Sequence, residues 1–180
     1  MTTGLPAGVP GSAVLPAPLA GLPVAQVGIL VPDLAAGIAT WSALLGGDDW
    51  LIYTYGPDTV PQLAYRGEPG TFRMRVALIG NAPQIELIES LEGPSIYTEW
   101  IAEHGYGLHH LGFRVPSVAE AIREVTASGV GLLQSGSGYG QGGDGGFAYF
   151  DTQDTVGLIV EAIEVPARRR PSEPLPRGRR

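Results

Sequence analysis

Apolar and polar residues alternate along two blocks of this chain, and both blocks predict the same order of elements. The first block begins with an alternating stretch at 24–31, which is typical of a strand. Apolar residues at helical spacing predict a helix at 34–45, which Pro32-Asp33 opens and Gly46-Gly47 ends. Further strands are predicted at 50–55, 72–79 and 84–89, with a loop rich in proline and glycine at 56–70. The order is therefore β-α-β-β-β.

The second block repeats this order after a short connecting helix at 95–104. Its first strand is predicted at 107–115. Ser117 as N-cap, Glu120 in the capping-box position and Gly129 at the end predict a helix over 117–128. Strands at 130–134, 147–151 and 157–164 complete the block, and the loop between the first two, 135–146, contains seven glycines.

The two blocks also repeat in their letters. A shift of 84 residues places Gln26-Val27-Gly28-Ile29-Leu30-Val31-Pro32 on His110-Leu111-Gly112-Phe113-Arg114-Val115-Pro116. One block alone would leave a face of its sheet uncovered, so we expect an α+β fold in which two paired β-α-β-β-β modules form a cleft between curved mixed sheets. The predicted division is a disordered arm (1–22), a first module (23–93), a connecting helix (94–106), a second module (107–166) and an arginine-rich disordered tail (167–180).

Composition limits the chemistry that such a cleft can hold. The 180 residues are 44% hydrophobic, which is typical of a globular protein. Because the chain has no cysteine, thiolate zinc sites, disulfides and cysteine nucleophiles are excluded. Any metal must bind through His, Asp, Glu or Gln side chains.

Charge is distributed unevenly between the body and the tail. All 11 basic residues are arginines, and six of them lie between Arg168 and Arg180 beside one acid, Glu173. The rest of the chain holds 5 arginines and 17 acidic residues, so its net charge of −12 would repel nucleic acid. The tail is predicted to be a solvated extension, with electrostatic contact to an acidic surface as the alternative. Residues 1–23 make a poor secretory signal and no apolar run is long enough to span a membrane, so we expect a cytoplasmic protein.

Four polar side chains fall at equivalent places of the two modules. Gln26 and His110 stand near the start of the two first strands, and Glu86 and Glu161 lie inside apolar runs of the two fourth strands. A carboxylate in such a run is costly unless it is paired or bound to a metal, although a single strand glutamate can also lie at an edge or face solvent. Pairing of the modules would bring the four side chains together. One imidazole and three oxygen donors suit a divalent cation such as Zn²⁺, Ni²⁺, Co²⁺, Mn²⁺ or Fe²⁺, and an octahedral ion would keep two positions open for adjacent oxygens of a substrate.

Strand alternation separates the two neighbouring histidines. His110 is expected on the same face as Leu108 and Gly112, whereas His109 takes the opposite face. Only one of the two can therefore face a given site, and His109 is predicted to be a packing or surface residue.

Two further residues are candidate substrate ligands. The glycine-rich loop 135–146 is not a phosphate-binding loop, since it lacks a Gly-Lys-Ser/Thr ending and leads into a strand. We expect a mobile flap over the cleft that carries Tyr139 toward a ligand, with a plain linker as the alternative. Arg75, on the third strand, would bind an anionic group of the substrate, or else pair with a neighbouring acid.

These segments resemble the vicinal oxygen chelate superfamily, which includes glyoxalase I, methylmalonyl-CoA epimerase, extradiol dioxygenases and antibiotic-resistance proteins. The resemblance spans about 24–166 and is carried by residues 26–46, 84–89, 107–115 and 157–164. Pro94-Ser95-Ile96 and Trp100-Ile101, followed by Gly107-Leu108-His109-His110, look most like the methylmalonyl-CoA epimerase branch.

The resemblance implies a metal held by Gln26, Glu86, His110 and Glu161. The epimerases usually have histidine at the first of these positions, whereas one type of glyoxalase I is similar to this chain in having Gln, Glu, His and Glu. It implies a metal-dependent isomerase or epimerase, in which Glu161 or Glu86 moves a proton next to the carbonyl of a small carbonyl compound or acyl thioester through a metal-stabilised enolate. A glyoxalase I-like lyase acting on a thiol adduct and a non-catalytic, resistance-type ligand-binding protein are the alternatives. A homodimer that binds a small-molecule substrate is expected.

Overall fold

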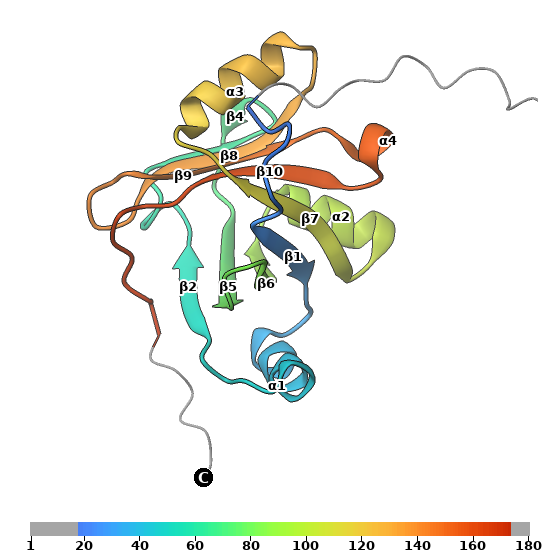
Figure 1. The fold of residues 1–180 in the computed structure, drawn as a ribbon, viewed down its shortest axis with the longest axis vertical. Coiled ribbons are helices and arrows are strands. Elements are labelled where there is room, and N and C mark those ends of the chain that lie inside the picture. Colours follow the sequence, from blue (N-terminus) through green and yellow to red (C-terminus); the bar gives the residue numbers. More distant parts are fainter. Residues whose placement is uncertain (1–17, 174–180) are drawn as a thin grey trace, which may run out of the picture.

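The computed structural model describes residues 18–173, which contain ten strands joined in one continuous sheet. Across the sheet the order is β2-β5-β6-β1-β7-β10-β9-β8-β3-β4 (Figure 1). The elements are β1 (Gln26–Leu30), α1 (Leu34–Leu45), β2 (Leu51–Tyr55), β3 (Gln62–Tyr65), β4 (Glu68–Pro69), β5 (Arg73–Ile79), β6 (Gln84–Glu92), α2 (Ile96–His104), β7 (Gly107–Arg114), α3 (Val118–Ala127), β8 (Leu132–Tyr139), β9 (Gly145–Phe150), α4 (Gln153–Val156) and β10 (Ile159–Glu164). None of the helices in this part of the chain combines the length and apolar character needed to cross a bilayer.

Two β-α-β-β-β modules make up most of this sheet. The first contains β1, α1, β2, β5 and β6, and the second contains β7, α3, β8, β9 and β10. In each module the first strand runs parallel to the last, so β1 lies beside β6 and β7 beside β10. The modules meet where β1 and β7 pair in antiparallel orientation. The predicted α+β fold with paired modules is confirmed, and the two modules of a single chain share one curled mixed sheet.

Helices α1 and α3 cover their own modules at opposite ends of the molecule (Figure 1). Helix α1 begins where the Asp33 side chain accepts a hydrogen bond from Ala36 N (2.7 Å), and it ends at Gly46, whose φ of 71° suits glycine. Helix α3 begins in the same way, with Ser117 Oγ accepting from Glu120 N at 3.2 Å. The apolar face of α1 packs on β5 and β6, and that of α3 packs on β9 and β10. Each helix therefore covers the outside of the sheet and leaves the inner face to the site.

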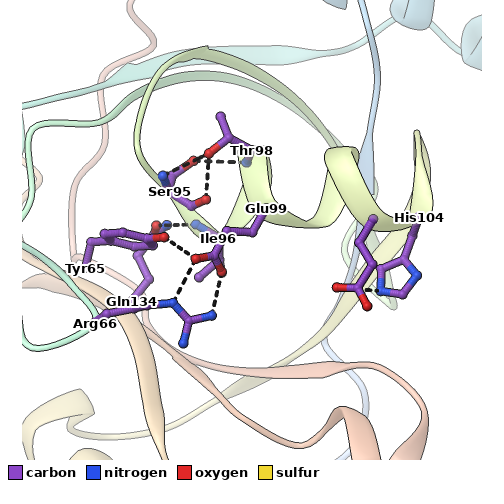
Figure 2. Close-up of polar contacts among 9 residues, drawn as sticks. Tyr65, Arg66, Ser95, Ile96, Thr98, Glu99, His104 and Gln134 are labelled. Carbon is purple, nitrogen blue, oxygen red and sulfur yellow. Dashed lines mark hydrogen bonds and ion pairs between the residues drawn. The ribbon is translucent and has the colours of Figure 1, made fainter.

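The connecting helix α2 is fixed at its first turn by side chains from two directions (Figure 2). Ser95 and Thr98 form a capping box, in which Thr98 N donates to Ser95 Oγ and Ser95 N donates to Thr98 Oγ1. Gln134 of β8 accepts a hydrogen bond from Ile96 N at 3.1 Å. The second module thus satisfies a backbone N–H that a helix start would otherwise leave without a partner.

The loop predicted at 56–70 contains the two short strands β3 and β4. Strand β3 pairs with β8, so a segment of the first module extends the sheet of the second. Arg66 and Gly67 both have positive φ (48° and 85°), as in the two-residue turn of a hairpin. Arg66 and Tyr65 also donate hydrogen bonds to Glu99 of α2 (Figure 2). Arg-Gly is a weaker hairpin signal than Asn-Gly, and the sequence therefore predicted a loop here.

The segment predicted as a mobile flap, 135–146, is mostly a hairpin. Strand β8 continues to Tyr139 and β9 begins at Gly145, so only a short turn separates them. The glycines inside these strands leave room for large neighbours, since a Cβ on Gly136 would lie 2.4 Å from Phe147 Cζ. Tyr139 is therefore held by strand pairing.

Part of the tail predicted to be disordered is ordered in the structure. Residues 165–173, which we call the C-terminal strap, leave β10 and run to the edge strand β2 (Figure 1). Ser172 N donates to Ile52 O (2.8 Å), and Thr54 N donates to Ser172 Oγ (2.9 Å). Glu173 continues this pairing as a bridge to Ile52. The strap satisfies backbone groups on the edge of the first module with residues that follow the second.

The arm predicted to be disordered also reaches the structured part of the chain. Leu19 is 2% exposed and packs in the core beneath α3. The remainder of the predicted arm, residues 1–17, and of the predicted tail, residues 174–180, lies outside the described residues.

Candidate metal centre

Three buried side chains face one another at the centre of the sheet. Glu86 of β6, His110 of β7 and Glu161 of β10 are 8%, 0% and 4% exposed. His110 Nε2 lies 3.4 Å from Glu86 Oε2 and 3.1 Å from Glu161 Oε2. The ligating atoms of all three residues lie within 4.8 Å of one another. The fold thus brings together three of the four side chains that the repeat places at equivalent positions.

Two glycines make room for this cluster, one in each first strand. Gly28 of β1 lies opposite both Glu86 and His110, its partners in the two neighbouring strands. Gly112 of β7 lies opposite Glu161. A Cβ on Gly28 would lie 1.9 Å from His110 Cε1, and a Cβ on Gly112 would lie 3.1 Å from Glu161 Oε2. The imidazole therefore occupies the space that a side chain at position 28 would need, whereas a Cβ at position 112 would meet Ile163 Cδ1 first, at 2.6 Å.

The chemistry and spacing of these atoms fit a divalent metal ion. Glu86 Oε2, His110 Nε2 and Glu161 Oε2 are buried, and none has a hydrogen-bond partner within residues 18–173. Buried polar atoms are seldom left in this state. Two ligand atoms that each lie about 2.1 Å from a metal, at right angles, are about 3.0 Å apart. The distances of 3.1 and 3.4 Å from His110 Nε2 to the carboxylates match that spacing.

Without a metal, a proton would have to balance the two carboxylates. Burial alone would lower the pKa of His110, but Glu161 and Glu86 outweigh burial and raise it to about 9. Burial also raises the pKa of Glu86 above its usual value. The two carboxylates thus favour a positive charge at the centre of the cluster. This charge can be the imidazolium of His110, or a metal ion that takes the place of the proton on Nε2.

His109 contacts the His110 ring, although regular strand alternation predicted that the two histidines would lie on opposite faces. Strand β7 has a bulge at this point: Gly28 is paired with His110 but Ile29 with Leu108, so His109 is the extra residue and both histidines are fully buried. Their Nδ1 atoms lie 3.0 Å apart. Burial lowers the pKa of His109, so its neutral ring accepts a hydrogen bond from His110 Nδ1–H. This contact directs His110 Nε2 toward the glutamates.

Aromatic side chains surround His109 on its other sides. The ring centroids of Tyr97, Trp100 and Tyr149 lie 5.3, 5.2 and 6.0 Å from that of His109. Tyr97 and Trp100 come from α2, so this helix contributes to the packing around His109. His109 is thus the packing residue that the sequence predicted, with an additional contact to His110.

Gln26 lies at the wall of the same central cavity. It is 6% exposed, and its amide nitrogen donates to Gln84 Oε1 at 3.1 Å. The cavity has a volume of about 20 Å³, and Gln26, Glu86 and Glu161 line it together with Tyr55, Tyr139 and Arg169. This is room for about one water molecule. Metal binding by Gln26, Glu86, His110 and Glu161 is a prediction that this geometry supports.

Comparison with known proteins agrees with this geometry. The family description "Glyoxalase/Bleomycin resistance protein/Dioxygenase superfamily" matches residues 25–150, a range that includes Gln26, Glu86 and His110. The chain belongs to this superfamily. The resemblance that the sequence predicted is therefore confirmed, and the strand that carries Glu161 lies beyond the matched range.

Several solved structures share the fold. A Streptomyces coelicolor methylmalonyl-CoA epimerase variant in complex with 2-nitronate-propionyl-CoA is 21% identical, with 79% of this chain and 97% of that chain covered and a TM-score of 0.56. The methylmalonyl-CoA epimerase from Mycobacterium tuberculosis is 23% identical, with 83% and 91% covered and a TM-score of 0.54. A hypothetical protein from Bacillus halodurans is 20% identical, with 83% and 99% covered and a TM-score of 0.54. A search of curated proteins gave no match.

The two candidate substrate ligands, Tyr139 and Arg75, lie in different surroundings. Tyr139 lines the central cavity and is 5% exposed, and burial raises the pKa of its hydroxyl, which is therefore neutral. Arg75 pairs with Glu89 at 3.1 Å and with Glu173 at 2.9 Å, and it does not line the central cavity. For Arg75 the structure thus shows the ion-pair alternative. Contact of either residue with a substrate stays a prediction.

Arg169, which belongs to the C-terminal strap, lines the central cavity. The sequence did not predict this residue as part of the site. Its guanidinium carbon lies 5.6 Å from the centroid of the Tyr53 ring and 5.5 Å from that of Tyr139. The arginine- and proline-rich tail has no periodicity that would predict a fixed position for one of its side chains. The one hint in the sequence was the charge of this basic segment, which led to the alternative prediction that the tail contacts an acidic surface.

Proposed function

We propose that this chain is a metal-dependent enzyme of the isomerase or epimerase type, which moves a proton at a carbon next to a carbonyl. The substrate is a small carbonyl compound or an acyl thioester. The observation that carries this proposal is the set of three buried atoms without hydrogen-bond partners, Glu86 Oε2, His110 Nε2 and Glu161 Oε2, two of which line one cavity.

The residues of the cluster have distinct roles in the proposed reaction. Gln26, Glu86, His110 and Glu161 hold the ion, and His109 keeps the His110 ring in the orientation that binding needs. The ion, when bound, polarises the carbonyl and stabilises the negative charge that develops as the neighbouring proton leaves.

Proton transfer is assigned to the two glutamates. Glu86 comes from the first module and Glu161 from the second, on opposite sides of the β1–β7 pair. One carboxylate oxygen can take the proton from one side of the carbon, and the other can return a proton from the opposite side, which is what an epimerase requires. Arg75 of the third strand is not available as a second base, since it pairs with Glu89 and Glu173.

The surroundings of the cluster favour such a transfer. Tyr149 and Phe147 line the cavity with apolar rings, and its volume of about 20 Å³ excludes bulk water. In such a site the interactions of charged groups with a substrate are stronger than in water.

Solvent deuterium uptake tests this proposal. We expect protein loaded with Co²⁺ or Zn²⁺ to incorporate deuterium at the α-carbon of methylmalonyl-CoA in D₂O, as measured by mass spectrometry. Glu161→Gln is expected to lower the exchange rate at least about 100-fold, because it removes a proton acceptor and a ligand charge. Glu68→Gln, which changes an exposed strand glutamate, is the matched control and should exchange at the wild-type rate. Exchange that persists in Glu161→Gln would remove Glu161 from this role.

A glyoxalase I-like lyase is the second candidate, favoured by Gln26 at the wall of the cavity. That reaction would move a proton between two carbons of a thiol adduct with one carboxylate. It predicts metal-dependent turnover that requires a thiol such as glutathione, whereas the first proposal predicts exchange without a thiol. Purified protein that holds no metal and binds ligand without exchange or turnover would favour the resistance-type binding protein instead.

A further inference from the structure

We propose that Arg169 is a specificity-determining residue that binds a carboxylate of the substrate, so that the site selects carbonyl compounds that carry this group. The inference rests on the proposed function, because it takes the carbonyl end of the substrate to lie at the metal centre. Arg169 belongs to the strap, outside the range matched by the superfamily.

Arg169 stands where three cavities meet. One is the central cavity with Glu86 and Glu161. The second, of about 250 Å³, extends toward Thr54 and Arg170, and the third, of about 160 Å³, extends toward Arg114. Arg169 lines all three. A ligand that extends from the metal centre into either larger cavity therefore lies beside this guanidinium.

The guanidinium has no carboxylate partner among the described residues. Residues 18–173 contain every Asp and Glu of the chain, and within them the arginines that form ion pairs are Arg66, Arg73, Arg75 and Arg123. Arg169 Nε is buried and makes no hydrogen bond with a described residue. A terminal nitrogen makes only a long contact, 3.4 Å, to the Tyr139 hydroxyl. A half-buried cation whose Nε lacks a hydrogen bond is costly, so an anion that enters the cavity gains by pairing with it.

Charge and shape both favour a carboxylate as that anion. Two glutamates, a divalent ion and Arg169 leave one positive charge in the cavity when His110 is neutral. The glutamates and the ion neutralise each other, so a carboxylate that lies beside Arg169 pairs with the charge that remains. The planar guanidinium also matches the two oxygens of a carboxylate, and it packs near the Tyr53 and Tyr139 rings, whose centroids lie 5.6 and 5.5 Å from its carbon.

Two hydroxamates that differ by one carboxylate provide the test. Acetohydroxamate and malonomonohydroxamate chelate a metal through the same two adjacent oxygens, and binding of each to Co²⁺-loaded protein is followed by the visible absorption of the ion. We expect wild-type protein to bind malonomonohydroxamate at least about tenfold more tightly than acetohydroxamate. In Arg169→Met this preference should fall to within about twofold, with the acetohydroxamate affinity unchanged.

Matched variants separate the side chain from its surroundings. Arg168→Met removes the same charge from an exposed neighbour and should keep the full preference. Arg169→Lys keeps the charge without the two parallel donors and should keep part of it, which also tests the proposal if Arg169→Met does not fold. Equal affinity of wild-type protein for both hydroxamates, or equal losses in Arg169→Met, would overturn the role of Arg169 while leaving the metal site intact. Failure of wild-type protein to bind Co²⁺ would overturn the proposed function and this inference with it.

Discussion

The first strands of the two modules have the same pattern but supply the site with different side chains. The antiparallel register places Gln26 opposite Gly112, and His110 opposite Gly28, so each polar side chain lies across from the glycine of the other module. His110 directs Nε2 at both glutamates, whereas the amide of Gln26 donates to Gln84. The repeat therefore preserves the space for a site, while the polar side chains on its two sides differ.

The bulge in β7 adds to this difference. His109 is the extra residue of the bulge, and its ring contacts His110 Nδ1. The shift of 84 residues places Ala25 at the equivalent position of the first module, where the side chain has no polar atom. Only the imidazole is thus oriented by its neighbour in the chain. We infer that His110 is the strong ligand of the pair and Gln26 the weak one.

Removal of each ligand in turn is the most direct test of this asymmetry. We expect His110→Ala to lower metal affinity more than about 100-fold, and Gln26→Ala to lower it by about tenfold or less. The reason is that His110 lies between both carboxylates, whereas Gln26 has an alternative partner in Gln84. Competition with a chromophoric chelator for Zn²⁺ or Co²⁺ measures both affinities. His104→Ala, which removes an exposed histidine, is the control; equal losses in the first two variants would make Gln26 a full ligand.

Substitution of the two glycines should also affect the modules unequally, with the larger loss of stability at Gly28, beside His110. In Gly28→Ala the new Cβ would overlap the buried His110 ring at 1.9 Å, so we expect the free energy of unfolding to fall by about 2–3 kcal/mol. In Gly112→Ala the nearest atom is the flexible Cδ1 end of Ile163, at 2.6 Å, so about 1 kcal/mol is expected. Denaturant unfolding of the metal-free proteins measures both values.

A third glycine serves as control for this pair. A Cβ on Gly131 would meet no atom closer than 3.4 Å, so Gly131→Ala should leave stability nearly unchanged. A larger loss in Gly112→Ala than in Gly28→Ala would show that the ring of His110 can move aside, and would weaken its assignment as the strong ligand.

Stability should depend on pH through His110 and not through Gln26, which does not titrate. The folded-state pKa of His110 is raised from 6.5 to about 9, so its charge stabilises the fold fully below pH 6.5, and this contribution is lost as the pH rises to about 9. We expect the free energy of unfolding of metal-free protein to fall by up to about 3 kcal/mol across this window. His109 has the opposite effect. Burial lowers its pKa, so its neutral ring favours the folded state less and less as the pH falls below 6.5, and the free energy of unfolding decreases there.

Metal removal and one substitution isolate this effect. Metal-saturated protein should show little change between pH 6.5 and 9, because the ion replaces the proton on His110 Nε2. His110→Gln makes the two modules alike at this position and should remove the pH dependence of the metal-free protein in the same window. A pH dependence that survives in His110→Gln would assign the titration to another group.

The site was easier to predict from sequence than the residues that support it. Glu86, His110 and Glu161 could be grouped because the repeat marks equivalent strands, and strand neighbours within a module follow from its order. The bulge at His109 could not, since it depends on the register between β1 and β7, which one strand does not encode.

Long-range pairing explains the other differences. Helices α1, α2 and α3 agree with their predicted bounds to within one residue because caps such as Asp33 and Ser117 act within one turn, whereas the short helix α4, which has no side-chain cap, was not predicted. Strand β3 is stabilised by β8, and the position of Arg169 is set by the docking of Ser172 and Glu173 on β2. Partners so distant in the chain leave no local pattern, and a tail rich in arginine was therefore predicted to be solvated.

The C-terminal strap is a further difference between the modules, since only the second module is followed by such a segment. Its ion pair provides the smallest expected effect on stability. The strap follows β10 of the second module and ends on β2 of the first, where Arg75 pairs with Glu173 at 2.9 Å. Their side chains are 29% and 38% exposed, so Glu173→Gln should lower the free energy of unfolding by less than about 1 kcal/mol. Because the strap carries Arg169 over the cavity, the same variant should release bound Co²⁺ to a chelator a few times faster. Glu120→Gln, which removes the exposed pair with Arg123, is the control and should change neither quantity. An unchanged release rate in Glu173→Gln would mean that the metal leaves by a route that the strap does not cover.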